Sequence, residues 1–259
     1  MAGGELAGQD LSTDEIAVAA LEFEARSLGR ASRRAGLCAL GDGSLLRVSG
    51  VGGDNAARAA RELVAAGAGA LLSWGVAGAL DPALTCGAVL LPAEILCPGT
   101  GAAALPLQRF ATCRSWRERV AAALQVHATV TSGALLTSAL PVAAAKLKAR
   151  MFQETRAVAV DMESAAVARV AAEHQLPFIT LRVILDSATV SLPASVMRTL
   201  EPANARRTGV WRAWALLSAP ADWGALLRLA AAYRLARRVL HDCARRADPT
   251  RAPAGQGGG

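Results

Sequence analysis

Residues 158–168 read V-A-V-D-M-E-S-A-A-V-A, an apolar stretch with two carboxylates set into it. The residues up to Asp161 predict a short buried strand, and those from Glu163 onward predict a helix. An acidic residue at a helix start is often a cap, which is the interpretation we favour for Asp161. Apolar residues flank Glu163 on both sides, so its carboxylate is the stronger candidate for a ligand contact.

Short apolar runs and longer helical patterns alternate on both sides of this stretch. This order predicts an α/β fold, a single domain with a mostly parallel or mixed central sheet flanked by helices on both faces. Gly67 is placed to end the first helix. The expected strands cover residues 15–21, 44–49, 70–74, 88–91, 128–132, 157–161 and 177–184, and the expected helices begin near Asp54, Arg114, Pro141, Glu163 and Ala225.

The composition fits one globular domain with extensions. The chain has 259 residues, of which 53% are hydrophobic and 19% charged, so a sizeable core can form and wholesale disorder is excluded. We expect a disordered N-terminus, a core domain, a basic helical extension and a disordered Gly- and Pro-rich tail. These segments cover residues 1–14, 15–197, 198–248 and 249–259.

Several kinds of protein are disfavoured by what the sequence lacks. No apolar run reaches the roughly 18 residues of a membrane-spanning helix. The first residues have neither the basic start nor the apolar block of a signal peptide, so we expect a cytoplasmic protein. The five cysteines are scattered and only three histidines could join them as ligands, so neither a metal site nor a disulfide framework is expected.

Candidate ligand-binding residues gather at the ends of the expected strands. In sheets of this kind, ligands bind beyond the carboxyl ends of the strands. Glu24 follows the first strand, and the turn S-G-V-G-G (49–53) follows the second and opens a helix whose free amides can hold an anion. Gly75 and Gly78 end the third strand, where they let the backbone approach a ligand closely.

The last core strand carries Arg182 inside an apolar run that stops at Asp186. A buried guanidinium needs a partner, and we expect that partner to be Asp186 or Glu163 in either a structural or a functional ion pair. Lys146 and Lys148, on an earlier helix, are expected to be solvated.

Together these segments resemble the nucleoside phosphorylase and nucleosidase superfamily over about residues 15–197. The resemblance rests on V-D-M-E-S-A-A-V-A, followed about twenty residues later by L-P-F-I-T-L-R-V-I-L-D-S-A, and on the segments S-G-V-G and W-G-V-A-G-A-L-D-P-A-L-T-C-G-A-V-L-L-P in the same order. Within the superfamily the chain is most similar to the hopanoid-associated phosphorylases, through L-E-F-E-A-R, S-W-G-V-A-G-A-L-D-P-A-L and A-V-A-V-D-M-E-S-A-A-V-A.

This resemblance implies roles for particular residues. Met162 would pack on the ribose, and Glu163 would accept hydrogen bonds from the ribose hydroxyls, because charge-assisted hydrogen bonds are strong. Asp186 would be the general acid at N7 of the departing purine, since an adenine anion is a poor leaving group. Further substrate contacts are implied for Val76, Ala77, Gly78, Arg182 and Ser132.

The attacking group is left open between water and phosphate. Glu24 falls where hydrolytic members of the superfamily keep the glutamate that activates water. A phosphate would instead be held by cations and backbone amides, and Val76 and Leu185 depart from the serine or threonine that is common at their positions. The candidate phosphate-binding residues are Arg26, Ser49, Gly50, Gly52 and Gly53.

The resemblance implies an enzyme that releases adenine from adenosylhopane and leaves a ribosylhopane or phosphoribosylhopane. It also implies a homo-oligomer and no cofactor, with inorganic phosphate as a possible co-substrate. One alternative is the same cleavage of a soluble nucleoside such as methylthioadenosine, S-adenosylhomocysteine or adenosine. Another is an inactive family member that binds nucleoside or membrane.

The excess positive charge lies in the C-terminal fifth of the chain. Between residues 198 and 251 there are eleven arginines and four acidic residues, a surplus of seven that accounts for the whole net charge of +7. Apolar residues at 226, 229, 233, 236, 240 and 243 predict an amphipathic helix. This helix either packs on the domain or docks on the anionic surface of the inner membrane. Nucleic-acid binding is not expected, because no aromatic-basic recognition motif accompanies the charge.

Overall fold

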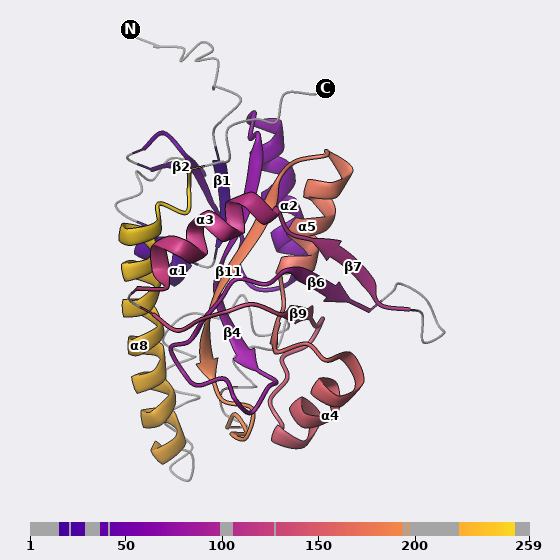
Figure 1. The fold of residues 1–259 in the computed structure, drawn as a ribbon, viewed down its shortest axis with the longest axis vertical. Coiled ribbons are helices and arrows are strands. Elements are labelled where there is room, and N and C mark those ends of the chain that lie inside the picture. The colour runs from indigo at the N-terminus through magenta and orange to yellow at the C-terminus, as the bar shows by residue number, and fades with distance from the viewer. Residues whose placement is uncertain are drawn as a thin grey trace, which may run out of the picture.

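The computed structural model shows one mixed β-sheet of eleven strands with helices packed against it (Figure 1). The main path through the sheet has the order β2-β3-β1-β4-β10-β9-β6-β7, and β11, β5 and β8 branch from it beside β4. The structure describes residues 16–20, 22–28, 37–40, 42–98, 106–126, 128–193, 196 and 223–251.

Strands outnumber helices up to β8, and strands and helices alternate from β9 onward. The bounds are β1 Ile16–Ala20, α1 Glu22–Ala25, the 3-10 helix η1 Arg26–Leu28, β2 Leu37–Ala39, β3 Leu45–Val48, α2 Gly53–Ala65, β4 Ala70–Ala79, β5 Val89–Leu90, β6 Glu94–Cys97, β7 Gln108–Ala111, α3 Arg114–Leu124, β8 Val130–Thr131, β9 Ala134–Thr137, α4 Ala145–Thr155, β10 Ala159–Asp161, α5 Ser164–Glu173, β11 Phe178–Asp186 and α8 Trp223–Ala247.

The pairing of the strands confirms the expected α/β fold with a mixed sheet. β1 pairs in parallel with β3 and β4, and β11 pairs in parallel with β4. β10 is antiparallel to β4 but parallel to β9. The arrows of β4 and β11 both point toward α4 in Figure 1, so their carboxyl ends lie at the same end of the molecule.

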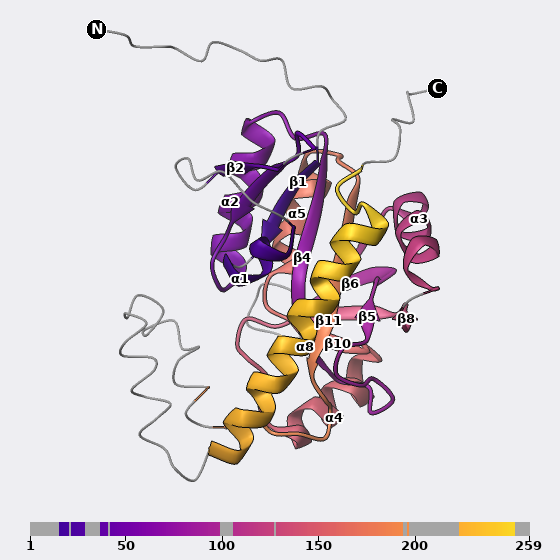
Figure 2. The same ribbon diagram turned by 90° about the vertical axis from the view of Figure 1, so that its left-hand side faces the viewer.

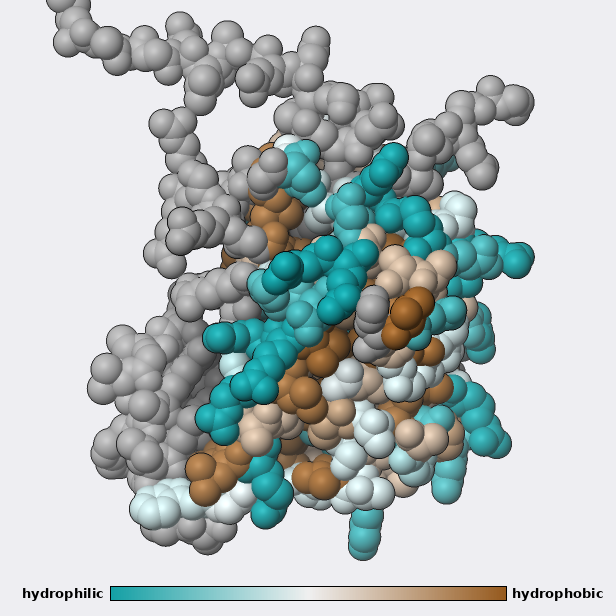
Figure 3. Space-filling view, turned by 60° about the vertical axis from the view of Figure 1, so that its left-hand side comes forward, coloured by the Kyte–Doolittle hydropathy of each residue, from teal (hydrophilic) through white to brown (hydrophobic). Residues whose placement is uncertain are grey.

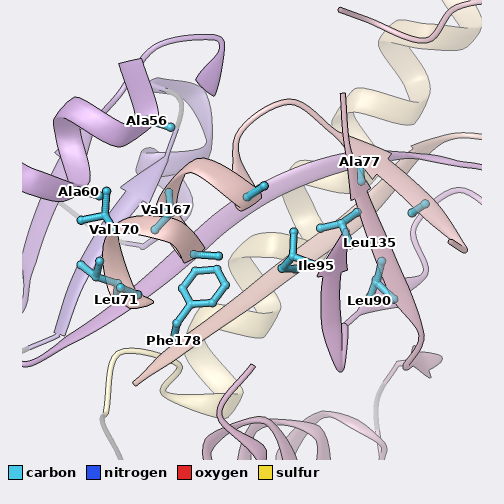
Figure 4. Packing of buried hydrophobic residues seen from close by; sticks show 14 of the residues in the cluster. Ala56, Ala60, Leu71, Ala77, Leu90, Ile95, Leu135, Val167, Val170 and Phe178 are labelled. Atoms are coloured by element: carbon cyan, nitrogen blue, oxygen red, sulfur yellow. The ribbon is translucent and has the colours of Figure 1, made fainter. Parts of the chain in front are cut away.

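Helices cover the two faces of the sheet, and the side chains of β11 point alternately into the two clusters that these helices form with it. Phe178 and Ile184 belong to a buried cluster with α2 and α5, part of which Figure 4 shows in close-up. Ile179, Leu181 and Val183, at the intervening positions, belong to a second cluster with α3 and α8. Both faces of the strand are thus buried, and burying each large apolar side chain contributes about 1.5–3 kcal/mol. Figure 2 shows α8 in front of β11 and α2 at the left-hand side of the molecule, beside β1.

Helix α2 begins and ends at glycines that the sequence marks. Its first residue, Gly53, follows Gly52, which has a positive φ of 97°. Two residues after its last residue comes Gly67, with φ 95°, a conformation that is easy for glycine and strained for other residues. The expected end of this helix is therefore confirmed. Helix α4 begins at Ala145 rather than near Pro141, and strands β2, β6, β7 and β9 were not expected from the sequence.

Helix α8 packs its apolar stripe on the protein. Ala236, Leu240 and Cys243, all on the face that the spacing predicts, are buried, while most arginines of the helix are exposed. Figure 3 shows hydrophilic side chains in a diagonal band across this side of the molecule, with hydrophobic residues next to it. This part of the stripe cannot also lie in a bilayer, which corrects the membrane interpretation for the C-terminal half of α8.

The tail was expected to be disordered from residue 249, and this is wrong for its first three residues. The Trp116 indole N–H donates to the carbonyl of Pro249 at 3.1 Å, and Arg119 donates to the carbonyl of Arg251. The Thr250 hydroxyl donates to Asp42 at 2.6 Å. Residues 249–251 therefore fasten the end of α8 to α3 and to the β2–β3 turn. The predictions for residues 1–14 and 252–259 lie outside the described residues, as do all of residues 198–222, including Trp211 and Trp214.

Within the described ranges, no helix combines the length and hydropathy that would let it cross a membrane.

Candidate active site

A cavity of about 280 Å³ lies beyond the carboxyl ends of β4, β10 and β11. Three carboxylates that are far apart in the sequence, those of Glu24, Glu163 and Asp186, line it together with Met162. The turn between β3 and α2 contributes Val51, and apolar side chains form most of the remaining wall. The other lining residues are Val76, Ala77, Gly78, Leu140, Pro141, Val142, Val160, Asp161, Leu185, Leu192, Val196, Leu229 and Tyr233.

Glu24, on the short helix α1, reaches the cavity through a gap left by a glycine of β4. Its side chain is 4% exposed, and its Oε1 accepts a hydrogen bond of 2.9 Å from the backbone N–H of Val76. A Cβ atom added at Gly75 would lie 2.3 Å from the same oxygen, closer than any real contact. Glycine at this position of β4 is therefore what lets the Glu24 carboxylate sit against the strand.

Glu163 immediately precedes α5, and backbone amides hold both of its carboxylate oxygens. The N–H of Gly52 donates to Oε1 at 2.8 Å, and that of Met162 donates to Oε2 at 3.2 Å. Burial and the nearby Asp161 charge raise the pKa of Glu163 to about 7, although the Gly52 amide and Arg182 oppose this rise. A carboxylate has lone pairs beyond these two bonds and can still accept hydrogen bonds from a ligand.

Asp186 ends β11 at an irregularity in the sheet. The register between β11 and β4 shifts between Ile184 and Asp186, which brings Asp186 opposite Gly78. A Cβ at Gly78 would lie 3.2 Å from Oδ1 of Asp186, so this second glycine makes room for the second carboxylate. Burial raises the pKa of Asp186, and the ammonium group of Lys148 lowers it again by a smaller amount.

Lys148 was expected to be solvated, and this is wrong. Its side chain is fully buried and forms an ion pair with Oδ2 of Asp186. Its ammonium group also donates to the carbonyl oxygens of Ser187 and Val190, both at 2.9 Å. The sequence does hold a signal for this burial, because Lys148 lies three and four residues before Met151 and Phe152, which pack against a buried cluster.

Arg182 pairs with Asp161, which corrects the expected partners Asp186 and Glu163. The pair is buried, with Nε and Nη2 within 2.9 and 2.8 Å of Oδ2. Nη2 also donates to the hydroxyls of Ser73 and Ser164, at 2.8 and 3.0 Å. Asp161 in turn accepts a hydrogen bond of 3.2 Å from the N–H of Ser164 at the start of α5, so the capping interaction expected for it is present beside the ion pair. Arg182 is not among the residues that line the cavity.

The glycine turn expected to hold phosphate has a different contact. The Gly52 amide binds Glu163, and Gly53 already belongs to α2. Neither of them lines the cavity, nor do Ser49 and Gly50. The side chain of Arg26, in η1, lies outside what the structure describes.

Ser132 is exposed between β8 and β9 and does not line the cavity. By contrast, the structure brings Leu229 and Tyr233 of α8 to the cavity wall, although no pattern in the sequence places the C-terminal helix there. Within the described residues, no group of three or more His, Cys, Asp and Glu side chains is placed to hold a metal ion.

Comparisons with known proteins bear on the fold as a whole. The family model of the phosphorylase superfamily matches residues 15–213, about three quarters of the chain. No curated protein matches the sequence.

Solved structures with the same fold include two described as 5′-methylthioadenosine/S-adenosylhomocysteine nucleosidases. The enzyme from Campylobacter jejuni has 23% identity and a TM-score of 0.60 over 68% of this chain and 86% of its own. The enzyme from Helicobacter pylori has 16% identity and a TM-score of 0.63 over 90% of this chain and 95% of its own. A futalosine hydrolase from Helicobacter pylori has 17% identity and a TM-score of 0.61 over 80% and 98%. At these identities the likeness establishes the fold.

Proposed function

The chain belongs to the phosphorylase superfamily, and on this premise we propose that it cleaves the N-glycosidic bond of a purine nucleoside and releases the base. The observation that carries the proposal is the meeting of Glu24, Glu163 and Asp186 in one cavity. They come from α1, the start of α5 and the end of β11, and each is held in place by a specific partner.

Each carboxylate has a role that its surroundings support. Asp186 donates a proton to N7 while the C1′–N9 bond breaks, so that the bonding electrons leave with a neutral base. Glu163 accepts hydrogen bonds from the ribose hydroxyls and stabilises the positive charge that develops on the ribose. Met162 lies beside Glu163 in the cavity wall and packs on the sugar.

We propose water as the attacking group, with Glu24 as its general base. A water molecule held by Glu24 forms the new bond to C1′ and gives its proton to the carboxylate. Glu24 lines the cavity, whereas the Gly52 amide that could hold a phosphate is bound to Glu163. Cleavage that depends on inorganic phosphate would reverse this choice and make phosphate the co-substrate.

For the substrate we propose a nucleoside with a large apolar 5′ substituent, specifically adenosylhopane. Two observations support this choice: the similarity of the sequence motifs to hopanoid-associated phosphorylases, and a cavity wall that includes Leu140, Leu192, Leu229 and Tyr233. Such a wall suits a hydrocarbon substituent, because it removes apolar surface from water. The product would then be ribosylhopane. A homo-oligomer is part of the same proposal.

The experiment incubates the protein with adenosylhopane in detergent, with methylthioadenosine and with adenosine, each with and without phosphate, and measures free adenine. We expect the fastest release from the lipid substrate, and no effect of phosphate. Release from the soluble nucleosides alone would favour the second candidate, a nucleosidase like those whose fold the chain shares. If no substrate yields adenine, the protein is not this enzyme and the binding-only alternative stands.

The variant Leu229→Asn tests the apolar wall. It should lower kcat/KM for adenosylhopane more than for adenosine, since it places an amide beside the hydrocarbon. Leu235→Asn is the matched control, because Leu235 lies on the same helix, is 42% exposed and does not line the cavity. Equal losses of kcat/KM on both substrates would show that the apolar wall does not select the substrate.

A lipid substrate would require access from a membrane, and we propose that the protein docks at the cytoplasmic surface of the inner membrane. The start of α8 presents exposed Trp223 and Leu227, and the helix has exposed arginines. Exchanging Arg228 and Arg234, both exposed in the first half of α8, for Glu should reduce co-sedimentation with anionic vesicles. Co-sedimentation equal to that of the unaltered protein would contradict docking through this helix.

A further inference from the structure

We infer that Lys148 is a positioning residue for the general acid: its ammonium group occupies Oδ2 of Asp186 and thereby directs the transferable proton to Oδ1. This inference rests on the proposed function of Asp186. It concerns a residue for which the sequence suggested only a solvated surface position.

The contacts of Lys148 account for every donor of its ammonium group. The three acceptors are Oδ2 of Asp186 and the carbonyl oxygens of Ser187 and Val190. An ammonium group has three N–H donors, so this buried cation is fully satisfied. Because a cation inside the protein is costly without such partners, the site is built for a charged lysine.

The position of Lys148 on α4 does not serve the helix itself. Lys148 lies in the first turn of α4, which begins at Ala145. The helix dipole disfavours a cation at this end, so the ammonium gains nothing from the helix and depends on the Asp186 carboxylate. Its side chain joins α4 to the end of β11 and to the residues that follow it.

The two oxygens of Asp186 have different surroundings. Oδ2 is paired with Lys148 and Oδ1 is not, while both oxygens lie close to Gly78 of the cavity wall, 3.2 Å (Oδ1) and 3.4 Å (Oδ2) from a Cβ atom added there. Among the described residues, none donates a hydrogen bond to Oδ1. An oxygen that already accepts from an ammonium group is a poor site for a proton, so the acid form of Asp186 carries its proton on Oδ1. That proton then faces the space where the base would lie.

Lys148 also affects when the proton is present. Its charge stabilises the ionised carboxylate, whereas burial stabilises the protonated one. Removing the charge of Lys148 would raise the pKa of Asp186, so the carboxyl would remain protonated to a higher pH. The other ionisable groups near Asp186 are the thiol of Cys86, which follows β4, and the cavity residues Glu24, Asp161, Glu163 and Tyr233.

The test compares Lys148→Gln with the unaltered protein. A glutamine side chain keeps two N–H donors for the carbonyls of Ser187 and Val190 but has no charge. The variant therefore separates two roles of Lys148: holding the segment after β11 in place, and positioning the proton of Asp186. We measure adenine release as kcat and KM across the pH range. We expect kcat to fall about 10- to 100-fold with KM changed less than about threefold, and the high-pH decline of activity to move to higher pH.

Two further variants complete the design. Lys148→Arg restores a cation beside Oδ2. Its activity should decline at the same high pH as that of the unaltered protein, even where kcat remains lowered. Lys146→Gln is the matched control, because Lys146 lies on the same helix and is exposed; it should leave kcat, KM and the pH profile unchanged. Circular dichroism at each pH checks that the folded fraction is constant, and a pH profile normalised to its own maximum is then independent of how much of the variant is folded.

The outcomes are distinguishable. If the unaltered protein releases adenine and Lys148→Gln shows the same kcat and the same pH profile, Lys148 only holds the residues after β11 in place, and the inference is overturned. The same holds if Lys148→Arg shares the shifted profile of Lys148→Gln, because charge would then not be the cause. If the unaltered protein releases no adenine from any nucleoside, the proposed function itself fails, and this inference fails with it.

Discussion

The Glu24 carboxylate lies in the space that a side chain at Gly75 would occupy. A Cβ atom there would be 2.3, 2.5 and 2.7 Å from three atoms of the carboxylate. A residue of α1 and a residue of β4 are thus complementary in shape, and the fold tolerates only glycine at Gly75 if Glu24 is to reach the cavity.

Gly75→Ala is therefore expected to displace Glu24 and to lower the rate of adenine release. A shift of about 1 Å in a reacting group can cost roughly 100-fold in rate, and we expect a loss of that order in kcat. Gly53→Ala is the control, because the nearest atoms to its added Cβ would be 3.7 and 3.8 Å away, in ordinary contact. Near-normal kcat in Gly75→Ala would show that the position of Glu24 does not matter for the reaction.

Glu163 should make the stability of the protein depend on pH in a particular direction. The unfolded chain ionises this carboxyl near its ordinary value of 4.5, and the folded protein ionises it near 7. The folded state therefore binds the proton more tightly, and the free energy of unfolding falls as pH rises from 4.5 to 7, by about 1–3 kcal/mol from this group. Glu163→Gln removes that contribution. Urea unfolding of both proteins at pH 5 and pH 8 measures it.

The variant should gain stability relative to the unaltered protein between pH 5 and pH 8, while losing activity, since a neutral amide accepts ribose hydroxyls less strongly. In the unaltered protein, kcat/KM should rise as pH passes through about 7, where Glu163 becomes ionised. An identical pH dependence of stability in the two proteins would mean that Glu163 does not titrate in this range.

The Asp161–Arg182 ion pair gives a prediction about stability alone. Arg182→Met leaves the Asp161 carboxylate buried without its cation, which should cost about 3–5 kcal/mol of unfolding free energy. Adding Asp161→Asn removes the unpaired charge, so the double variant should be more stable than Arg182→Met. Chemical denaturation of the two variants checks this. A double variant less stable than Arg182→Met would show that the lost unfolding free energy comes from the hydrogen bonds to the hydroxyls of Ser73 and Ser164 rather than from the unpaired charge.

An exposed pair serves as the comparison for that experiment. Arg114 and Glu118 form an ion pair on α3 in which both side chains are largely exposed. Arg114→Met should leave the denaturation midpoint unchanged within error, because exposed pairs contribute little.

The residues after α8 should contribute to stability although the sequence suggests a disordered tail. Truncation after Asp248 removes the carbonyl that accepts from the buried Trp116 indole, at a cost of about 1–3 kcal/mol. Truncation after Arg251 keeps this contact and should leave the thermal midpoint unchanged. Equal midpoints for the two truncated chains would show that the contact contributes nothing.

The sequence alone predicted the fold class and the carboxylates that meet in the cavity. The strand-to-helix junction at Asp161 and Glu163, and the strand that ends at Asp186, are local patterns, so their elements could be placed without tertiary information. Glycines at 75 and 78 were expected to allow a ligand to approach, and in the structure they also accommodate the side chains of Glu24 and Asp186.

The partner of Arg182 could not be predicted, because it depends on a register shift. Strict alternation along β11 would place Arg182 and Asp186 on the same face, four residues apart. The irregularity between Ile184 and Asp186 re-aims Asp186 toward Gly78, and Arg182 instead meets Asp161 across the sheet. No local pattern in the sequence marks this shift.

The burial of Lys148 and the position of α8 are also tertiary effects. A lysine on a helix is normally solvated, and only the acceptors at Asp186, Ser187 and Val190 make its burial possible. The stripe of α8 predicts which side of the helix is buried but not which surface it covers, so Leu229 and Tyr233 could not be assigned to the cavity beforehand.

The most direct test is a crystal structure of Asp186→Asn, which should bind but not cleave, with a 5′-substituted adenosine. We predict that N7 of the adenine lies within hydrogen-bonding distance of the side chain at position 186, and that the ribose hydroxyls contact Glu163. A nucleoside bound elsewhere, or one with its base turned away from position 186 in this cavity, would contradict the assignment of Asp186 as the general acid.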